Sequence, residues 1–400
     1  MKKRVLIVTE YYYPDIAANV GLIKDLAEYI GQYFDITVIT NEIRGATALV
    51  GDMQSNSKLI PISVIRKRNP FVRRRGLLSK ILEYATFIFT VTIYLKNRSS
   101  HFSAIFCQST PPLMSIPIRS VVNGKSKIVY NVQDLFPDSL IPYFSEHPYR
   151  ILRRLEKASY NAADIVVTIC TDFYNKINPL THSDIKVIPN WVDTDELTYV
   201  PKEKNRIYEV LKEIDWSKKS IVYSGNIGIN QDFDTVISVA KEFADCNFII
   251  IGNGKKHSEV LRKVKALGIS NFYFYDPFPK EWISDVYSFG DLYLLPMRKN
   301  AMKASFPSKT WSILACGSPL VASVDLGSNF AKELIQNDLA YVCDAEDHKG
   351  LVGALLLGLE ENRNRASRRV EYIKRNYNKE NILRQYKQIM MEIDIEHNYQ

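Results

Sequence analysis

Residues 291–324, DLYLLPMRKNAMKASFPSKTWSILACGSPLVASV, contain a complete strand–loop–helix–strand unit. The apolar run 292–295 predicts a strand, and a polar, lysine-rich loop follows it. A helix is expected over 308–316, and a second strand is expected over 319–323. Two strands joined through a helix run parallel, and parallel sheets are covered by helices on both faces. The segment therefore predicts a doubly wound α/β fold.

The same alternation of strands and helices fills both halves of the chain. Strands are expected in the first half at 5–8, 36–40, 62–65, 104–106, 127–132 and 164–169, and in the second half at 220–225, 247–252, 272–275, 292–295 and 319–323. Helices are expected at 16–30, 77–96, 112–122 and 148–161, and then at 232–243, 256–267, 280–288, 308–316, 329–336 and 346–358. Unbroken valine and isoleucine runs between helices indicate buried parallel strands.

A chain of 400 residues exceeds one ordinary core and suits two domains. We expect an N-terminal domain over 1–195 and a C-terminal domain over 196–378, with a helix over 379–400 packing back on the first. The polar stretch 193–206 follows Pro189-Asn190-Trp191 and is the expected linker. The predicted architecture is two Rossmann-like domains facing across a cleft, with ligands at the carboxyl ends of the strands.

Charge and cysteine usage narrow the class of protein. The formal net charge is +8, and basic residues cluster at 66–68 and 73–75. Such clusters favour a nucleotide, a lipid diphosphate or an anionic membrane surface as partner, and no nucleic acid is expected. The five cysteines and six histidines lack paired spacing, so no metal site is expected. The apolar run 5–8 is too short for a signal peptide, which predicts a cytoplasmic protein.

The loop before the helix of the opening segment is the strongest candidate for an anion site. Its residues Ser305, Phe306, Pro307, Ser308 and Lys309 place a hydroxyl, an ammonium and backbone N–H groups where the helix dipole favours an anion. A lysine in a first helical turn is otherwise unfavourable, because the dipole there is positive. Lys309 is therefore predicted to bind phosphate and to act in catalysis, with an ordinary surface lysine as the alternative. Ser308 either caps the helix or binds phosphate.

Glycines follow the first two strands of the second half. Gly225, Asn226 and Gly228 come directly after the first of these strands, and Gly252 ends the second. Glycine lets a backbone approach a diphosphate closely, although many such glycines only form turns. We predict that this loop contributes to the same phosphate site.

In the first half, Asp134 lies just after the strand 127–132, within NVQDLFPD. A carboxylate at the carboxyl end of a parallel strand suits catalysis or the binding of sugar hydroxyls, whereas capping the following turn is the alternative. Asp15 and Asn19 follow the first strand of the chain. They are expected to cap the next helix or to contact an acceptor.

A basic and then apolar tract covers 66–96, with RKRNPFVRRR followed by LLSKILEYATFIFTVTIYL. The longest uncharged run, 84–95, is too short to span a bilayer. A cationic cluster beside a broadly apolar helix is typical of an interfacial anchor, and a buried covering helix is the alternative. The residues predicted to contact an anionic membrane are Arg73, Arg74, Arg75, Phe71, Leu77 and Leu78.

These motifs resemble family 4 of the retaining glycosyltransferases. Pro307-Ser308-Lys309 ahead of LACGSPLV (314–321) is similar to the bacterial branch with P-S-K before an L-A-x-G-x-P-V-V block, and Gln133-Asp134 fits the same branch. The resemblance implies a GT-B fold, a nucleotide-sugar donor such as a UDP-sugar, retention of configuration, and no metal or cofactor. The chain also resembles the amino-sugar transferases of surface polysaccharide synthesis. This resemblance implies a polyprenyl-diphosphate-linked or glycan acceptor, and thus a position on the inner face of the plasma membrane.

The sequence departs from this family at several donor-binding positions. Asn226 and Gln231 stand where the family's G-R-L-x-x-x-K-G loop has Arg and Lys, and Ala304 and Ser312 stand where it has the two Glu of E-x7-E. Gly252-Asn253-Gly254 is similar to the family's I-G-x-G, which implies donor binding by Gly252. Base contacts are expected from the backbone around Asp276-Pro277-Phe278, with an ordinary β–α loop as the alternative. Two rival functions stay open: a nucleotide-sugar 2-epimerase, and a donor-binding scaffold without catalysis.

Overall fold

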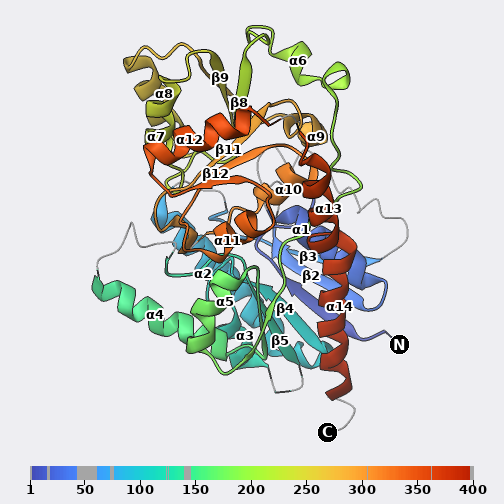
Figure 1. Cartoon of the computed structure of the whole chain (residues 1–400). Helices are drawn as coiled ribbons and strands as arrows, with labels where there is room; N and C mark the ends of the chain where they lie inside the picture. Colours follow the sequence, from blue (N-terminus) through green and yellow to red (C-terminus); the bar gives the residue numbers. More distant parts are fainter. Residues whose placement is uncertain are drawn as a thin grey trace. The chain divides into compact units, whose positions relative to one another are not determined.

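The computed structural model forms two compact units, which are described separately (Figure 1). The structure describes residues 2–15, 19–42, 61–72, 76–122, 124, 126–138, 146–303, 305–361 and 363–396. The first unit comprises Met1–Asn190 and the C-terminal segment from Glu380, and the second comprises Trp191–Lys379. The sequence had placed these boundaries at 195/196 and 378/379, whereas the chain crosses at 190/191 and 379/380.

The first unit is a parallel sheet of seven strands in the order β3-β2-β1-β4-β5-β6-β7. Its strands are β1 (Arg4–Val8), β2 (Asp35–Asn41), β3 (Ile62–Lys67), β4 (Ala104–Gln108), β5 (Lys127–Val132), β6 (Ile165–Thr168) and β7 (Asp184–Val187). Its helices are α1 (Val20–Gly31), α2 (Leu77–Lys96), α3 (Ser115–Val121), α4 (Glu146–Asn161), α5 (Thr171–Ile177) and α14 (Lys379–Glu396). The central strands β1 and β4 are fully buried apart from Arg4, as expected for a sheet covered on both faces.

The second unit is a parallel sheet of six strands in the order β10-β9-β8-β11-β12-β13. Its strands are β8 (Lys219–Ser224), β9 (Cys246–Ile251), β10 (Phe272–Tyr275), β11 (Leu292–Pro296), β12 (Leu320–Ser323) and β13 (Tyr341–Cys343). Its helices are α6 (Ile207–Val210), α7 (Phe233–Ala240), α8 (His257–Ala266), α9 (Ile283–Val286), α10 (Lys309–Ala315), α11 (Asn329–Gln336), α12 (His348–Leu359) and α13 (Ala366–Asn376). The predicted α/β class with two parallel-sheet units is confirmed.

The C-terminal helix α14 belongs to the first unit although it follows the second in sequence. The ring of Tyr386, which is buried, packs edge-on against Phe106 of β4 with a centroid separation of 6.0 Å. Five further described residues of α14 are also buried: Ile382, Leu383, Ile389, Met390 and Ile393. The helix therefore covers a sheet face that the first 190 residues leave available.

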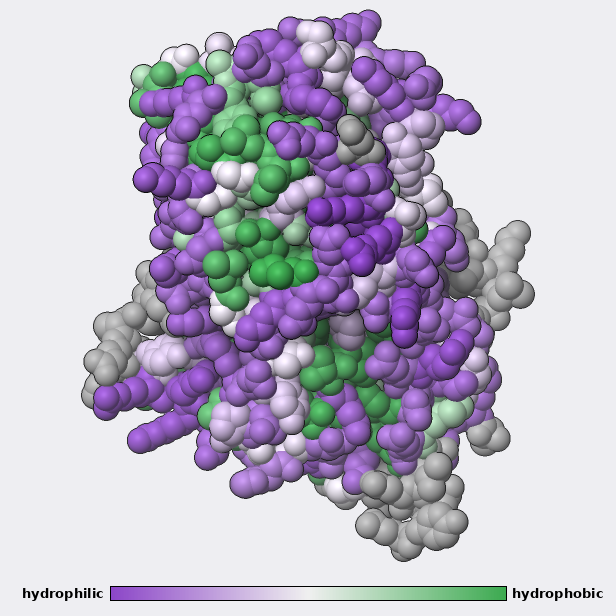
Figure 2. Space-filling model, viewed as in Figure 1, coloured by the Kyte–Doolittle hydropathy of each residue, from purple (hydrophilic) through white to green (hydrophobic). Residues whose placement is uncertain are grey.

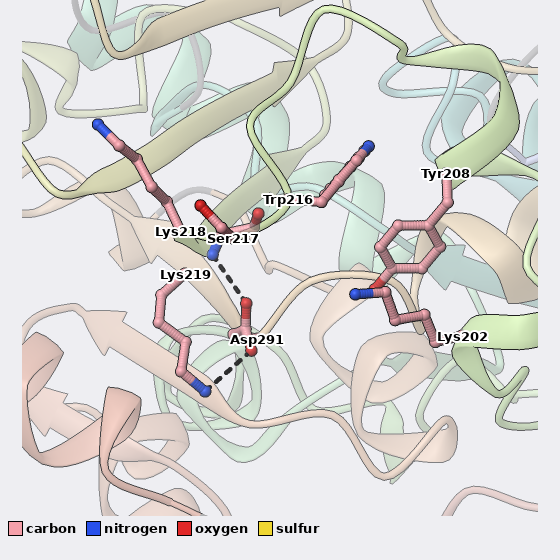
Figure 3. A pocket seen from close by; sticks show the side chains of 8 residues that line it. Lys202, Tyr208, Trp216, Ser217, Lys218, Lys219 and Asp291 are labelled. Atoms are coloured by element: carbon pink, nitrogen blue, oxygen red, sulfur yellow. Dashed lines mark hydrogen bonds and ion pairs between the residues drawn. The ribbon is translucent and has the colours of Figure 1, made fainter.

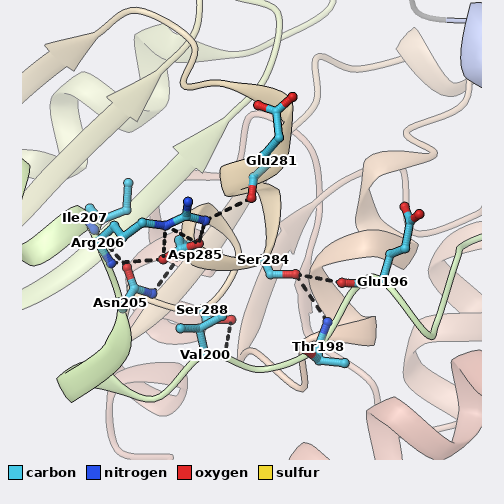
Figure 4. A network of polar contacts seen from close by, with 10 residues as sticks. All are labelled: Glu196, Thr198, Val200, Asn205, Arg206, Ile207, Glu281, Ser284, Asp285 and Ser288. Atoms are coloured by element: carbon cyan, nitrogen blue, oxygen red, sulfur yellow. Dashed lines mark hydrogen bonds and ion pairs between the residues drawn. The ribbon is translucent and has the colours of Figure 1, made fainter.

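The segment expected to be a linker is instead part of the second unit. Figure 4 shows residues 196–207 lying along α9. The backbone N–H groups of Thr198 and Val200 donate to the hydroxyls of Ser284 and Ser288 at 3.3 and 3.0 Å. Arg206 forms an ion pair with Asp285, whose carboxylate also accepts from the Arg206 backbone N–H at 2.9 Å. Polar composition alone suggested a free linker, but these polar groups pair with α9.

A buried ion pair holds α13 in the second unit. Arg369 donates through both terminal nitrogens to the two oxygens of Glu361, at 2.7 and 2.6 Å, and both side chains are almost fully buried. The Nε of Arg369 donates to the carbonyl of Leu339 at 2.8 Å, which ties α13 to the segment before β13. Every polar group of this bidentate pair therefore has a partner away from water.

We expect Arg369→Met to destabilise the protein by about 3–5 kcal/mol, because it leaves the Glu361 carboxylate buried without a counter-charge. Urea denaturation measures the effect. The double variant Arg369→Met with Glu361→Leu should recover most of the loss, since both charges are then removed. Equal stability of the single and double variants would show that packing, rather than the unpaired charge, sets the cost.

Candidate active site

Each sheet reverses its strand order at one place, and the predicted site residues follow the strands at or near these places. In the first unit the chain winds outward in opposite directions from β1 and β4, and in the second from β8 and β11. The loops that leave the carboxyl ends of two such strands diverge, which opens a space for a ligand. The residues after β8 and β11 therefore define the candidate site of the second unit, and those after β1, β4 and neighbouring β5 define that of the first.

The two glycines after β9 are required by the contact of their loop with the loop after β8. Gly252 has φ +149°, and a Cβ on it would lie 1.8 Å from the carbonyl oxygen of Gly225. Gly254 has φ +158°, and a Cβ there would lie 2.3 Å from the carbonyl oxygen of Ile227. The structure thus gives Gly252 a backbone neighbour, and its predicted contact with the donor stays a prediction. The binding of a diphosphate by Gly225 and Gly228 stays a prediction.

Amide side chains shape the loop after β8. The backbone N–H of Gly228 donates to Oε1 of Gln231 at 3.0 Å, so Gln231 closes the turn from within. The carbonyl of Asn226 accepts from the Tyr223 hydroxyl at 2.7 Å, and the Asn226 side chain is exposed at the end of the strand. The two positions where related loops carry cations therefore hold neutral amides. Gln231 shapes the loop, and the side chain of Asn226 faces solvent.

The loop after β8 is joined to the loop after β11. Nδ2 of Asn230 donates to the hydroxyl of Ser305 at 3.1 Å, and the backbone N–H of Arg298 donates to the carbonyl of Asn230 at 2.8 Å. The structure thus brings the predicted loop at 305–309 beside the predicted loop at 225–228. This proximity of the two loops supports their prediction as one site.

Lys309 is the first residue of α10, and its ammonium lies in an unusual environment. The side chain is exposed, yet the surrounding protein displaces water around it and lowers its pKa. Ser308 occupies the N-cap position but makes no capping hydrogen bond, which excludes the capping role in this structure. A reachable cation with poor solvation favours an anionic ligand, because the ligand restores the stabilisation that water no longer supplies.

Two of the predicted donor residues have packing roles. Phe306 is half-buried, and its ring contacts Phe330 edge-on with a centroid separation of 5.3 Å. Phe278 follows the edge strand β10, separated from β8 by β9, and stacks on Trp282 at 5.8 Å with an interplanar angle of 7°. The guanidinium of Arg206 lies 4.6 Å from the Trp282 ring centroid. A contact between Phe278 and a base stays a prediction.

In the first unit, Asp134 resembles Lys309 in its environment. Its side chain is exposed after β5, and partial burial raises its pKa. Neighbouring Gln133 is held by three hydrogen bonds. Its backbone N–H donates to the Ser109 hydroxyl at 3.1 Å, its Nε2 donates to Oδ1 of Asn131 at 3.3 Å, and its Oε1 accepts from Asn190 at 2.8 Å. Asp134 therefore projects from a fixed loop at the carboxyl edge, as a catalytic or acceptor-binding carboxylate requires.

Asn19 and Asp15 have partners within the unit. Asn19 is the N-cap residue of α1, but its side chain makes no cap and donates instead to Oε1 of Gln108 at 3.1 Å. The same Oε1 accepts from the Thr9 hydroxyl at 2.7 Å, so three polar residues meet where β1 and β4 diverge. Asp15 is 6% exposed. Contact of Asn19 or Asp15 with an acceptor stays a prediction.

A buried charged cluster beside β1 was missed by sequence reasoning. The Lys80 ammonium lies 2.5 Å from Oε1 of Glu10 and 3.2 Å from Oε2 of Glu83, and the Tyr11 hydroxyl donates to Glu83 at 2.6 Å. Burial raises the pKa of Glu10 to about 7, and Lys80 opposes this effect. Glu10 and Glu83 are more than 70 positions apart in the sequence, so only the fold could reveal the cluster.

Tyr84 links this cluster electrostatically to Asp134. Burial raises the pKa of the Tyr84 phenol, and the carboxylates of Glu10, Glu83 and Asp134 raise it further. The Lys80 ammonium lies 4.5 Å from the Tyr84 ring centroid. The carboxyl edge of the first unit therefore combines Asp134 with buried carboxylates, one ammonium and a half-buried phenol.

The helix α2 buries one face and exposes an apolar face. Glu83, Phe87, Val91 and Leu95 are buried at spacings of four residues. Its exposed large apolar residues are Leu78 (71% exposed), Ile81 (51%), Leu82 (37%), Phe89 (66%) and Ile93 (55%). By length and composition, Leu78–Lys96 is also the one helix among the described residues that could cross a membrane. The alternative of a fully buried covering helix is therefore wrong for this exposed face.

The other residues of the predicted membrane contact are only partly described. Arg73, Arg74 and Arg75 and the side chain of Leu77 lie outside the described residues. Phe71 is half-buried, and its backbone N–H donates to Oδ1 of Asn69 at 3.1 Å. No three or more His, Cys, Asp or Glu side chains among the described residues form a cluster that could hold a metal ion.

A pocket of about 220 Å³ lies at the opposite edge of the second sheet, at the amino end of β8 (Figure 3). Its lining includes Lys202, Lys218 and Lys219. Lys219 pairs with Asp291 at 3.1 Å, Lys218 donates to the carbonyl of Ala244, and Figure 3 shows the lysine side chains pointing in different directions. The pocket contains none of the predicted site residues, and its lysine side chains do not point toward a common anion position.

Two family models match the chain. The model "Glycosyltransferase Family 4" matches residues 22–196, and "Glycosyl transferases group 1" matches residues 209–378. WcaI of Escherichia coli, named as a colanic acid biosynthesis glycosyl transferase, is 26% identical over 58% of this chain. The match likewise spans 58% of the length of WcaI.

Solved structures of the same fold cover almost the whole chain. Sucrose-phosphate synthase from Thermosynechococcus elongatus has a TM-score of 0.77 at 14% identity, and the match covers 98% of this chain and 100% of that one. Anabaena HepE, solved in complex with UDP and glucose, has a TM-score of 0.73 at 16% identity with the same coverage.

The fold of the chain is the GT-B fold. Its N-terminal part matches the Family 4 glycosyltransferase model, and its C-terminal part matches the group 1 glycosyl transferase model.

Proposed function

We propose that this glycosyltransferase moves a sugar from a UDP-sugar to a polyprenyl-diphosphate-linked acceptor, with retention of configuration and without a metal or cofactor. The observation that carries the donor half is the desolvated, reachable ammonium of Lys309 beside the joined loops after β8 and β11. Relatives support the two substrates, since HepE is solved with UDP and glucose and WcaI is named for colanic acid biosynthesis. The product would therefore belong to a surface polysaccharide.

In this proposal the second unit binds the donor diphosphate. Lys309 stabilises the negative charge that develops on the leaving nucleoside diphosphate, which is the main contribution this chemistry needs from the protein. Asn226 and Ser305 offer neutral hydrogen-bond donors to the same oxygens, from loops that Asn230 holds together. Because Ser312 and Ala304 lack a carboxylate, another group must hold the ribose.

The first unit binds the acceptor in this proposal. Asp134 accepts a hydrogen bond from the acceptor hydroxyl and orients it toward the donor. A carboxylate with a raised pKa is a stronger base than a fully hydrated one, which suits this role. Epimerase activity is not favoured, because both family models and the curated relatives are transferases. A scaffold that binds the donor without catalysis would be detected by measuring UDP release with and without an acceptor.

The exposed face of α2 supports a membrane position on the inner side of the plasma membrane. Five large apolar side chains face outward along the helix, and the basic tract 66–75 precedes it in sequence. An apolar helix face next to clustered cations binds anionic lipid surfaces by combining apolar burial with electrostatic attraction. A lipid-linked acceptor would be presented at the same surface.

We expect Lys309→Ala to weaken UDP binding by about ten- to a hundredfold, as the loss of a charge-assisted hydrogen bond does. Isothermal titration calorimetry with UDP measures this loss. In the unaltered protein, UDP affinity should fall as pH rises through the lowered pKa of Lys309, because the neutral amine no longer attracts phosphate. Exposed Lys332 on α11 provides a control, and Lys332→Ala should bind UDP normally. Unchanged affinity in Lys309→Ala removes this residue from the donor site.

We expect Asp134→Asn to keep UDP affinity within about twofold and to lose most transfer, because the neutral amide is a much weaker base and hydrogen-bond acceptor for the acceptor hydroxyl than the carboxylate is. UDP release from a panel of UDP-sugars, with and without a bacterial lipid extract as acceptor, measures transfer. Reduced UDP affinity with normal release would place Asp134 on the donor side. If the unaltered protein binds UDP but releases no more UDP from UDP-sugars with the lipid extract than without it, the inactive scaffold would be favoured.

We expect the protein to float with anionic vesicles at low salt and to dissociate at high salt, since surface charge attraction is screened. Replacing Leu78 and Phe89 by Glu should abolish flotation, because both exposed side chains would enter the interface. Arg73, Arg74 and Arg75 replaced together by Ser should weaken it. The control is Leu356 and Leu357 replaced by Glu, on the apolar patch that Figure 2 shows over α12. If the unaltered protein stays in the soluble fraction, the membrane proposal is wrong.

A further inference from the structure

We propose that Tyr377 is a positioning residue for the donor loop and acts on Lys309 through the ring of Trp311. The inference rests on the proposed function, because it assigns a support to the same phosphate site. It concerns residues of the second unit only, and it begins with the contacts of α10.

Trp311 is the anchor of α10. It lies two residues after Lys309 and is 1% exposed. Its ring stacks on Tyr377 with a centroid separation of 4.2 Å and an interplanar angle of 23°. Phe330 contacts the same ring at 5.5 Å, and Phe306, at the start of the donor loop, contacts it at 6.2 Å. The loop and the helix therefore rest on one aromatic cluster.

No side-chain cap fixes the first residue of the helix, so its position depends on packing. α10 has only seven residues, and no side chain caps its N-terminus. A helix of two turns without a cap is marginal by itself, so its position depends on tertiary packing. Lys309 is at the first helical position, and a shift of Trp311 therefore moves the Lys309 ammonium.

Tyr377 is itself held by its hydroxyl, by its carbonyl and by the contacts of the two residues that follow it. Its hydroxyl donates to Oε1 of Glu333 at 2.5 Å. Its carbonyl accepts from the backbone N–H of Val192 at 2.8 Å, and Val192 pairs with Asn378 in a parallel bridge. Lys379 then pairs with Asp193 at 2.9 Å. The ring that supports Trp311 therefore stands where the chain enters and leaves the second unit.

Tyr372 in α13 offers a matched comparison with Tyr377, which is the C-cap residue of that helix. Its hydroxyl also donates to Oε1 of Glu333, at 2.8 Å. Its ring centroid lies 6.3 Å from that of Tyr377, and it is Tyr377, not Tyr372, that stacks on Trp311. Replacing Tyr372 removes a similar ring and a hydrogen bond to the same carboxylate, but leaves the stack on Trp311 in place.

The experiment compares UDP binding by calorimetry in Tyr377→Leu, Tyr377→Phe and Tyr372→Leu, together with thermal unfolding of each variant. We expect Tyr377→Leu to weaken UDP binding about tenfold, the scale of one aromatic stacking contact. Tyr377→Phe keeps the stack and should bind UDP as the unaltered protein does, although it loses the Glu333 hydrogen bond. Tyr372→Leu should lower thermal stability and leave UDP affinity unchanged. Equal UDP affinities in Tyr377→Leu and the unaltered protein, or an equal loss in Tyr372→Leu, would overturn the inference.

A second readout separates this inference from the proposed function. Acylation of lysines at pH 8, resolved by peptide mass spectrometry, reports the reactivity of Lys309 without any donor. Because its pKa is lowered, Lys309 should react faster than exposed Lys332, and Tyr377→Leu should reduce this difference while Tyr372→Leu retains it. If the unaltered protein fails to bind UDP, the proposed donor is wrong and the acylation pattern still decides the positioning role. An unchanged Lys309 reactivity in Tyr377→Leu contradicts it.

Discussion

The reversal of strand order within each sheet is the constraint on which the candidate site depends. Helices that leave β8 and β11 cover opposite faces of the second sheet, so their connecting loops part above the carboxyl edge. Backbone groups in such loops cannot all pair within regular structure. The chain satisfies several of them with amide side chains, as where Gln231 accepts from Gly228 and Asn230 donates to Ser305. Neutral groups therefore set the shape of the loops, and charge is supplied separately by Lys309.

Much of this fold follows from the sequence because the central strands are continuous apolar runs. The residues VLIV of β1 and FIII of β9 are buried on both faces, and their neighbours alternate with helices. The edge strands β7 and β13 were missed, because β7 is only half-buried and carries Asp184 and Lys186, and β13 has only three residues. Strand prediction from hydrophobicity is weakest where a strand is short or carries charges, since the edge strands β3 and β10 were predicted.

The candidate site was predicted less completely, for a related physical reason. Lys309 and Asp134 follow strands and could be recognised from their positions, whereas Glu10, Lys80 and Glu83 interact only once β1 and α2 are packed together. The roles of the glycines also depend on a neighbour, since Gly252 is required by the Gly225 carbonyl and not by any local turn. Sequence pattern gives the end of a strand, but the partner of a side chain there is a property of the fold.

The composition of α2 connects the carboxyl edge of the first unit, where the acceptor is proposed to bind, with the exposed apolar face of this helix. An ordinary surface helix buries apolar residues and exposes charges, but α2 buries Glu83 and exposes Leu78 and Phe89. A buried carboxylate is costly unless it is paired, and Lys80 bridges Glu83 to Glu10 while the Tyr11 hydroxyl satisfies the remaining oxygen. The inner face of α2 is thus polar only around Glu83, on the side of Asp134, whereas the rest of the inner face and the outer face are apolar. A helix of this kind suits an acceptor with a polar head and an apolar chain, since one element then serves both parts of the molecule.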